Sequence, residues 1–417
     1  MPPQEDGRTR SGRIGSTLAL VLVPVLVLGV VGFLVTRGGR ADVDAGHGAA
    51  PHASSPSASP SSATPETPLR PGETRMRVGI DGGPYTPVAQ NRATDDYRCF
   101  LIDPGLDADA FLTGVRFLPG NPGVVHHAIL YRVEPDQIPA AQALDSADDG
   151  LGWSCFGGPG LPRAAGRASG PTASLDSAPW LAAWAPGGEE RVIGGGLGVP
   201  MTAGSRAVLQ VHYNLRGGTG SDDTAVDLRL APGTADLTPL ETMLLVAPVE
   251  LPCLANESGP LCDRTASVFD TVRRYGEDSG RTIAGLQMLC DGDPLDPAAG
   301  PTQSCDRRIE EPITVYGAAG HMHLLGRSIT VELNPGTPQA RTVLDIPVWD
   351  FDDQSSRTLA EPVRVDKGDV LRVTCTHDAG LRQMLPSLQD VEPRYVTWGE
   401  GTTDEMCLAI LSVTRGS

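Results

Sequence analysis

Lysine is almost absent from this sequence of 417 residues, which has only Lys367. Arginine and lysine together number 33 against 51 acidic residues, so the formal net charge at pH 7 is −18. No basic patch offsets this charge, and nucleic-acid binding depends on clusters of cationic side chains that meet the phosphates. The composition therefore argues against a nucleic-acid partner.

The sequence also lacks any C-x-x-C pair, although it contains eight cysteines, all beyond residue 98. This absence argues against a cysteine zinc site and against a thioredoxin-like redox motif. An even number of cysteines in an exported chain instead predicts disulfide bonds. No Ser-His-Asp arrangement suitable for nucleophilic catalysis is evident either.

Charged residues are missing from residues 14–36, a mainly apolar run that as a helix would span about 34 Å, enough for a bilayer. Arg8, Arg10 and Arg13 precede it, which predicts a cytoplasmic N-terminus over residues 1–13. We expect an uncleaved transmembrane anchor with the rest of the chain exported. A cleaved signal peptide, which would give a secreted protein, is the alternative. Residues 37–75 are rich in Ala, Ser and Pro and predict a flexible linker.

The 50 glycines and 37 prolines are typical of short strands joined by many turns. We therefore predict an all-β fold of two successive antiparallel β-sandwich domains, jelly-roll-like, at residues 76–235 and 236–417, behind the transmembrane helix. Residues 250–310 have the composition of an insertion rich in Asp, Gly and Pro. The expected strands cover residues 110–117, 124–132, 206–214, 226–230, 242–247, 313–316, 327–333, 341–348, 369–376 and 406–413.

Histidines occur in three motifs on these expected strands. The first is the adjacent pair His126-His127. Neighbouring residues on a regular strand face opposite ways, so this pair cannot easily bind one ion. Either one histidine is structural, or the backbone is bulged or at a strand end.

The second motif places Gln210, His212 and Asn214 on one strand face, where a solvated surface is the alternative interpretation. The third is His321-Met322-His323. Residues one apart share a face of an extended strand, so His321 and His323 could chelate one transition metal, for which imidazole is a common ligand. Satisfied core or surface histidines are the alternative.

Together these motifs resemble the copper type II, ascorbate-dependent monooxygenases, whose best-known members hydroxylate peptidyl-glycine or dopamine. The resemblance covers about residues 90–415 and implies two copper ions per chain. One copper would be held by His126, His127 and His212, and the other by His321, His323 and Met406. The supporting motifs are Tyr97-Arg98-Cys99, Trp153-Ser154-Cys155, Trp184-Ala185-Pro186-Gly187-Gly188, Gly368-Asp369-Val370-Leu371 before Cys375, and Asp404-Glu405-Met406-Cys407.

The resemblance implies an oxidoreductase that hydroxylates an aliphatic C–H of a small substrate with O2 and electrons from ascorbate or another small reductant. The first copper would transfer electrons and the second, at the catalytic residues His321, His323 and Met406, would activate O2. A thioether favours Cu(I), which suits Met406, although core packing is the alternative role for a methionine. Gln210 would orient a ligand or water at the first centre.

The same resemblance implies the disulfide bonds Cys99–Cys155 and Cys375–Cys407, the second of which would fix the strand that carries Met406. Four further cysteines have three possible connectivities. These are Cys253, Cys262, Cys290 and Cys305.

Departures from the family pattern argue against peptidyl-glycine as the substrate. Ala319 stands where the amidating members have a substrate-binding arginine, and Ile410 stands where they have a tyrosine. Ala128 follows the His-His pair in place of the usual methionine. A second hypothesis is therefore a non-catalytic copper-binding or extracellular interaction protein on the same scaffold. A third is a zinc hydrolase, for which we find no carboxylate base near either histidine pair.

Overall fold

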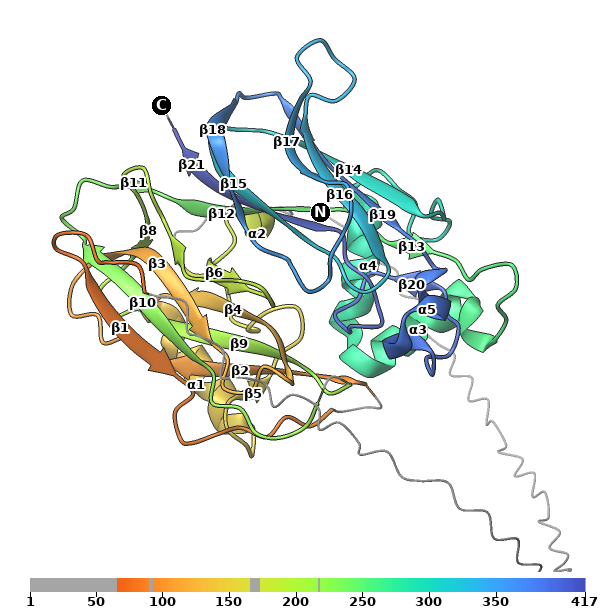
Figure 1. Cartoon of the computed structure of the whole chain (residues 1–417), viewed down its shortest axis with the longest axis horizontal. Coiled ribbons are helices and arrows are strands. Elements are labelled where there is room, and N and C mark those ends of the chain that lie inside the picture. The colour runs from red at the N-terminus through yellow and green to blue at the C-terminus, as the bar shows by residue number, and fades with distance from the viewer. Residues whose placement is uncertain (1–65, 90–92, 166–172, 217, 417) are drawn as a thin grey trace, which may run out of the picture. The chain divides into compact units, whose positions relative to one another are not determined.

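The computed structural model describes residues 66–89, 93–165, 173–216 and 218–416 (Figure 1). The predicted cytoplasmic segment, the transmembrane anchor and linker residues 37–65 lie outside these residues. Across the described ranges, no helix combines the length and apolar character needed to cross a bilayer. The linker prediction extended too far, because strand β1 begins at Thr74 and the Glu73 carboxylate pairs with Arg229 at 2.6 Å.

Two sheets form the N-terminal half of the described chain. One has the strand order β1-β10-β3-β8-β11 with β7 beside β3, and the other has the order β5-β2-β9-β4-β6. All pairings are antiparallel except that of β11 with β8. The strands are β1 Thr74–Gly79, β2 Asp95–Ile102, β3 Ala110–Leu118, β4 Val125–Val133, β5 Trp153–Ser154, β6 Trp180–Trp184, β7 Arg191–Val192, β8 Leu197–Met201, β9 Arg206–Asn214, β10 Ala225–Pro232 and β11 Thr238–Pro239.

A single hydrophobic core joins these two sheets. Leu112 and Leu228 from the first sheet belong to the same buried cluster as Leu130 and Leu209 from the second. Such alternation along β9 points one set of side chains into this core and the opposite set, which includes His212, away from it. Leu209 belongs to the core cluster, and Gln210 and His212 do not.

The C-terminal half contains three further antiparallel sheets. Their orders are β12-β21-β15-β18, β14-β19-β16-β17 and the pair β13-β20. Buried Val315 and Leu411 of the first sheet share a core cluster with Ile329 and Val373 of the second. The strands are β12 Glu241–Val246, β13 Glu250–Leu251, β14 Thr302–Arg308, β15 Ile313–His321, β16 Gly326–Leu333, β17 Arg341–Ile346, β18 Arg357–Val365, β19 Val370–His377, β20 Val396–Thr397 and β21 Leu408–Arg415.

The mainly β class is confirmed, and the sheet membership moves the expected boundary between the two halves. Strand β11 still pairs with β8 of the N-terminal half, whereas β12 pairs with β21 of the C-terminal half. The change of sheet therefore falls between Pro239 and Glu241 rather than at residue 235. The jelly-roll topology stays a prediction.

Helices were not expected in the segment from 250 to 310, yet it contains α3 and α4. The Asp263 side chain accepts a hydrogen bond from the Ala266 N–H at the start of α3, as an N-cap residue does. Arg274 of α3 is buried and pairs with Asp404 at 2.6 Å, so this insertion packs on the loop that precedes Met406. The helices are η1 Pro135–Gln137, α1 Ile138–Ala147, α2 Ala173–Asp176, η2 Pro260–Cys262, α3 Arg264–Tyr275, α4 Glu277–Leu289, α5 Leu381–Met384 and η3 Pro386–Leu388.

Candidate metal centres

Three histidines converge on the face of the β5-β2-β9-β4-β6 sheet that points away from its core. They are His126 and His127 of β4 and His212 of β9, and we call them the first histidine cluster. The pairing of β4 with β9 shifts register between Val125 and His127, which is the bulge that the sequence left open as one alternative. Because of this irregularity, two adjacent histidines can approach the same point.

Their spacing suits one metal ion. The Nδ1 atom of His212 lies 3.3 Å from Nδ1 of His126 and 3.2 Å from Nδ1 of His127. One ligand atom from each residue can be chosen so that all lie within 4.8 Å of one another. Spacings of this order would allow imidazole nitrogens to bind one ion with metal–nitrogen bonds of roughly 2.0 Å.

Asp95 of β2 fixes the tautomer of His212. Its carboxylate lies 2.8 Å from Nε2 of His212 and accepts a hydrogen bond from the N–H group there, so the lone pair of the neutral ring is on Nδ1, toward the other two histidines. Burial alone would raise the pKa of Asp95, but hydrogen bonds from His212, Thr402 and Thr94 hold that pKa below its ordinary value. Both Asp95 and His212 are fully buried.

The other two rings of the cluster also favour the neutral form that a metal ligand requires. Burial, and next the neighbouring His212, place the pKa values of His126 and His127 well below the ordinary value. The ring of Phe351 stacks on His126 with centroids 4.4 Å apart. The Nε2 atom of His126 is buried and finds no hydrogen-bond partner among the described residues.

His321 and His323, which we call the second histidine pair, do not lie on one regular strand as predicted. Strand β15 ends at His321, and His323 lies in the turn before β16. The pairing of β15 with β21 stops at His321 opposite Leu408, which leaves the next residues free to turn. His321 is partly buried, and His323 is fully buried.

The hydrogen bonds of this pair leave a lone pair on Nε2 of each ring. Nδ1 of His321 donates to Gln354 Oε1 at 2.6 Å, and the Gln354 amide nitrogen donates to the Phe351 carbonyl, which fixes the amide orientation. Nδ1 of His323 donates to the Asp404 carbonyl at 3.2 Å. Nε2 of His323 is buried without a partner in the described part of the chain, as expected of an atom reserved for a metal. Burial, and next His323, lower the pKa of His321 to about 3.

Met406 lies in the loop that holds His323 in place. The buried Glu405 carboxylate accepts the backbone N–H groups of His323 at 2.9 Å and Leu325 at 2.5 Å. Nε2 of His377, a histidine outside the three motifs, donates to the Met406 carbonyl at 3.2 Å. Met406 is itself buried, and its neighbours Asp404 and Glu405 both hydrogen-bond to His323. Two nitrogens and a thioether form a donor set that suits Cu(I).

Disulfide bonds lie near both the first histidine cluster and the loop that contains Met406. The structure contains Cys99–Cys155 and Cys375–Cys407, the two bonds that the family resemblance implies. The second joins β19 to the residue after Met406. Of the three connectivities left open for the other cysteines, the structure has Cys253–Cys262 with Cys290–Cys305.

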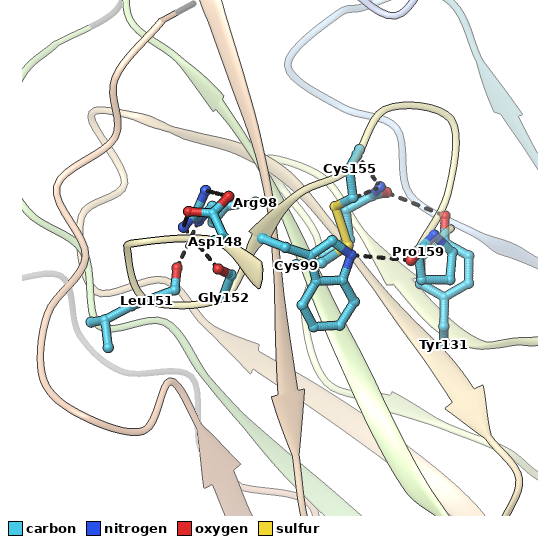
Figure 2. Close-up of a disulfide and its surroundings, with 10 residues drawn as sticks. Arg98, Cys99, Tyr131, Asp148, Leu151, Gly152, Cys155 and Pro159 are labelled. Carbon is cyan, nitrogen blue, oxygen red and sulfur yellow. Dashed lines mark hydrogen bonds and ion pairs between the residues drawn. A yellow bond between two sulfur atoms is a disulfide. The ribbon is translucent and has the colours of Figure 1, made fainter. Parts of the chain in front are cut away.

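Gln210 does not have the role predicted for it. Its amide nitrogen donates to the Cys155 carbonyl at 3.0 Å, and its oxygen accepts from the Tyr131 hydroxyl at 3.2 Å. Figure 2 shows Tyr131 beside the Cys99–Cys155 disulfide. Gln210 therefore supports the disulfide, and the orienting role at the histidines belongs to Asp95. Alternation on β2 could have signalled this, because Asp95 is two residues before Tyr97 and shares its strand face.

Two further residues lie near the histidines: Tyr97, which the sequence showed only as part of a supporting motif, and Thr402, which was missed. The Tyr97 ring stacks on His212 with centroids 4.1 Å apart, and its hydroxyl donates to the Glu400 carbonyl at 2.6 Å. The Thr402 hydroxyl donates to Asp95 at 2.5 Å. Residues 400–406, the loop before β21, thus contact Tyr97 and Asp95, the neighbours of His212, and also contact His323. No local sequence pattern connects this loop to β2, about 300 residues earlier.

Two carboxylates lie beside the histidine groups, where the sequence showed no sign of a carboxylate base. Asp95 contacts His212, and Glu405 accepts from the backbone of His323. Both carboxylates are buried and already accept several hydrogen bonds, so neither is placed to activate water as a general base. The zinc hydrolase hypothesis gains nothing from them.

The two histidine groups lie next to each other. The rings of His127 and His321 are 5.3 Å apart between centroids and meet edge to face. Both rings line one cavity, together with Ala319 and Ile410. The first histidine cluster therefore fits one metal ion, and the second histidine pair lies beside it at the same cavity.

Comparison with known structures adds no argument about the fold. Similarities were found to dimeric latent PorU from Porphyromonas gingivalis (10% identity, 78% of this chain and 25% of that chain, TM-score 0.16) and to the coconut allergen cocosin (9%, 81% and 85%, 0.16). A variant of the oxalate decarboxylase of Bacillus subtilis is similar at 6% identity over 84% of this chain and 78% of that chain, with a TM-score of 0.12. This chain thus spans about a quarter of the length of PorU, and these scores are too low to indicate a shared fold.

Among curated proteins no sequence matches this chain. A family match does exist, to the C-terminal domain of copper type II ascorbate-dependent monooxygenases, and it covers residues 299–412. That range contains the second histidine pair and Met406, and it ends within β21. Residues 299–412 therefore match the C-terminal domain of the copper type II ascorbate-dependent monooxygenase family.

Proposed function

We propose that this protein is a copper-dependent monooxygenase that hydroxylates an aliphatic C–H of a small substrate, using O2 and a one-electron reductant such as ascorbate. The proposal includes two copper ions per chain. The first would be bound by the first histidine cluster, and the second by the second histidine pair with Met406. The observation that carries the proposal is that the first histidine cluster and the second histidine pair meet at one cavity, lined by His127 and His321, in a chain whose residues 299–412 match the family.

The protein's own residues would prepare these sites by controlling protons. Asp95 keeps a proton on Nε2 of His212, so Nδ1 is available as a ligand atom. Gln354 and the Asp404 carbonyl keep protons on Nδ1 of His321 and His323, so Nε2 is available. Copper, when bound, would supply the one-electron redox chemistry that the activation of O2 needs.

The same residues would also exclude water and hold the geometry. His212 and His323 are fully buried, and Phe351 covers His126. Glu405 fixes the turn of His323 through two backbone N–H groups. A rigid site of this kind limits how far the ligands must rearrange when the copper changes oxidation state.

Metal analysis after loading with an equal mixture of copper and zinc tests the proposal directly. We expect two copper ions per chain in the wild type and one in the variant His212→Gln, because only the first cluster loses a ligand. Preferential binding of zinc would contradict the proposal. Oxygen uptake with ascorbate, measured across a panel of small substrates, then tests for catalysis.

A non-catalytic copper-binding protein is the second candidate, and one observation favours it. Ala319 and Ile410 line the cavity at the positions where the resemblance implies, in the amidating members, a substrate-binding arginine and a tyrosine. If two coppers bind but ascorbate and O2 give neither uptake nor product across the panel, this second function is the better description.

The four disulfide bonds indicate an extracytoplasmic location. We propose in addition that residues 14–36 anchor the protein in the membrane. Carbonate extraction of the membrane fraction tests this: an anchored chain stays with the membranes, whereas a cleaved and secreted form appears in the medium.

A further inference from the structure

The cavity beside the two histidine groups has an apolar wall and one cationic group. Trp180 and Trp184 of β6 form part of the wall, and Ala319 and Ile410 form another part. The cationic group is Arg191 of β7. Because His127 and His321 line the same cavity, a molecule bound there would lie against both proposed copper sites.

Arg191 has a neutral hydrogen-bond partner in place of an acidic one. Nη2 of its guanidinium donates to the Ser412 hydroxyl of β21 at 2.7 Å. Among the described residues, no carboxylate lies within ion-pair distance of Arg191. The neighbouring Glu190 is occupied by Arg75 at 3.0 Å and by the Thr67 N–H at 2.8 Å.

A cation without a counter-ion is unusual at such a place. Burial lowers the pKa of Arg191, and no anion in the described part of the chain opposes this effect. One hydroxyl uses one of the five N–H donors and supplies no negative charge. Arg191 is partly buried and faces the cavity, and an unpaired cation in that place indicates an anion that is brought by a ligand.

We propose that Arg191 binds the carboxylate of a substrate with an apolar body, an aryl- or alkyl-carboxylate, inside this cavity. The inference rests on the proposed function and deepens it by naming the substrate class. Arg191, which belongs to the N-terminal half of the chain, would thus take the substrate-binding role that the resemblance gives to an arginine at the position of Ala319.

A carboxylate fits better than other anions. The residues that line the cavity include a single arginine and no lysine, so the formal positive charge matches a monoanion. The planar guanidinium forms parallel hydrogen bonds with the two oxygens of a carboxylate. The two tryptophans would pack on the apolar body, as aromatic side chains commonly do in ligand pockets.

Phenylacetate and its neutral analogue phenylacetamide are suitable probes because they differ only in the charged group. Binding to the copper-free full chain is measured by calorimetry and by the fluorescence of the cavity tryptophans, without reductant. We expect phenylacetate to bind at least tenfold more tightly than phenylacetamide, since a hydrogen bond to a charged group is worth roughly tenfold or more in affinity. Benzylphosphonate, a dianion, is expected to bind no better than phenylacetate.

Three variants separate binding from structure. Arg191→Met removes the charge and should abolish the preference for the acid. Ser412→Ala removes the hydroxyl that accepts from the guanidinium and should retain that preference, whereas a purely structural role for Arg191 would make both variants alike. Arg281→Met is the matched control, because Arg281 lies on α4 with its side chain 69% exposed.

Equal binding of phenylacetate and phenylacetamide to the wild type would overturn the proposal, and this comparison does not depend on the folding of any variant. A folded Arg191→Met that keeps the preference would overturn it as well. Copper content is measured on the same samples. Loss of acid binding with both coppers retained would separate the role of Arg191 from the copper function, whereas a wild type that binds no copper would refute the proposed function alone.

Discussion

Replacement of Asp95 by asparagine is the most direct test of how the first histidine cluster is prepared. The Asp95 carboxylate accepts from His212 Nε2 at 2.8 Å and from the hydroxyls of Thr402 at 2.5 Å and Thr94 at 2.6 Å. Asparagine is nearly isosteric but uncharged, and its amide nitrogen can donate to Nε2 in place of accepting from it. A His212 ring in that tautomer would carry its proton on Nδ1 and could not bind metal there.

The expected effect on metal affinity is large. Loss of a partner that orients a metal-binding histidine usually weakens metal binding roughly 10- to 100-fold. We therefore expect the Kd of copper at the first cluster to rise by about that factor. The assay is competition with a chromophoric Cu(I) chelator in a His323→Gln background, where only the first cluster is intact.

The same variant should change the pH dependence of stability. The pKa of Asp95 is lowered in the folded protein, since its hydrogen bonds outweigh the effect of burial. The carboxylate thus stabilises the fold above its unfolded pKa of about 3.9, and the stabilisation is lost as the pH falls toward the lower folded pKa. Asparagine does not titrate, so Asp95→Asn should be less stable than wild type at pH 7 by about 1–3 kcal/mol, with the difference shrinking in acid.

Asp222→Asn is the matched control. Asp222 is equally buried and accepts from the Tyr213 hydroxyl at 3.0 Å and the Thr224 hydroxyl at 2.9 Å, so its side-chain partners are hydroxyls rather than a histidine. It should lose stability without losing copper affinity. If Asp95→Asn binds copper as tightly as this control does, Asp95 does not set the tautomer and our reasoning about the first cluster fails.

Three further predictions follow from the same contacts. Met406→Ile should abolish oxygen reactivity with ascorbate while the first histidine cluster still binds copper, and loss of both sites or of neither would show that the ligands are wrongly divided. The copper-free protein should lose stability as the pH falls from about 6.5 toward 3, by at most about 1.4 kcal/mol per pH unit for His321. Burial lowers the pKa of His321 to about 3, so the unfolded chain takes up the proton first. Thermal unfolding of His321→Gln should depend less steeply on pH, and an unchanged slope would argue that His321 is not buried as a neutral base. The double variant Cys375→Ala/Cys407→Ala removes a bond between residues 32 apart and should lower the free energy of unfolding by roughly 3–4 kcal/mol, measured by denaturant titration of the oxidised proteins.

Local sequence patterns determined most of the strands that carry the histidines. The expected strand at residues 206–214 is β9 itself, and the one at 124–132 differs from β4 by a single residue at each end. Strands with strong apolar alternation are readable because one face is buried against a core. Strands β14 and β18, which are polar and mostly exposed, were missed because they have little apolar alternation to detect.

The sequence by itself also determined which residue types could bind metal: five histidines in three motifs, with Met406 and two of the disulfide pairs supplied by the family resemblance. Only the tertiary structure decided which polar groups orient them. Asp95 and Thr402 meet although 307 residues separate them, and Glu405 folds back onto the turn at His323. Such contacts depend on how two halves of the chain pack, and no local period of 2 or 3.6 encodes that packing. Tertiary structure also decided the surroundings of Arg191, which no sequence motif marks. Its side chain lines a cavity between β7 and β21, where no counter-ion for it lies among the described residues.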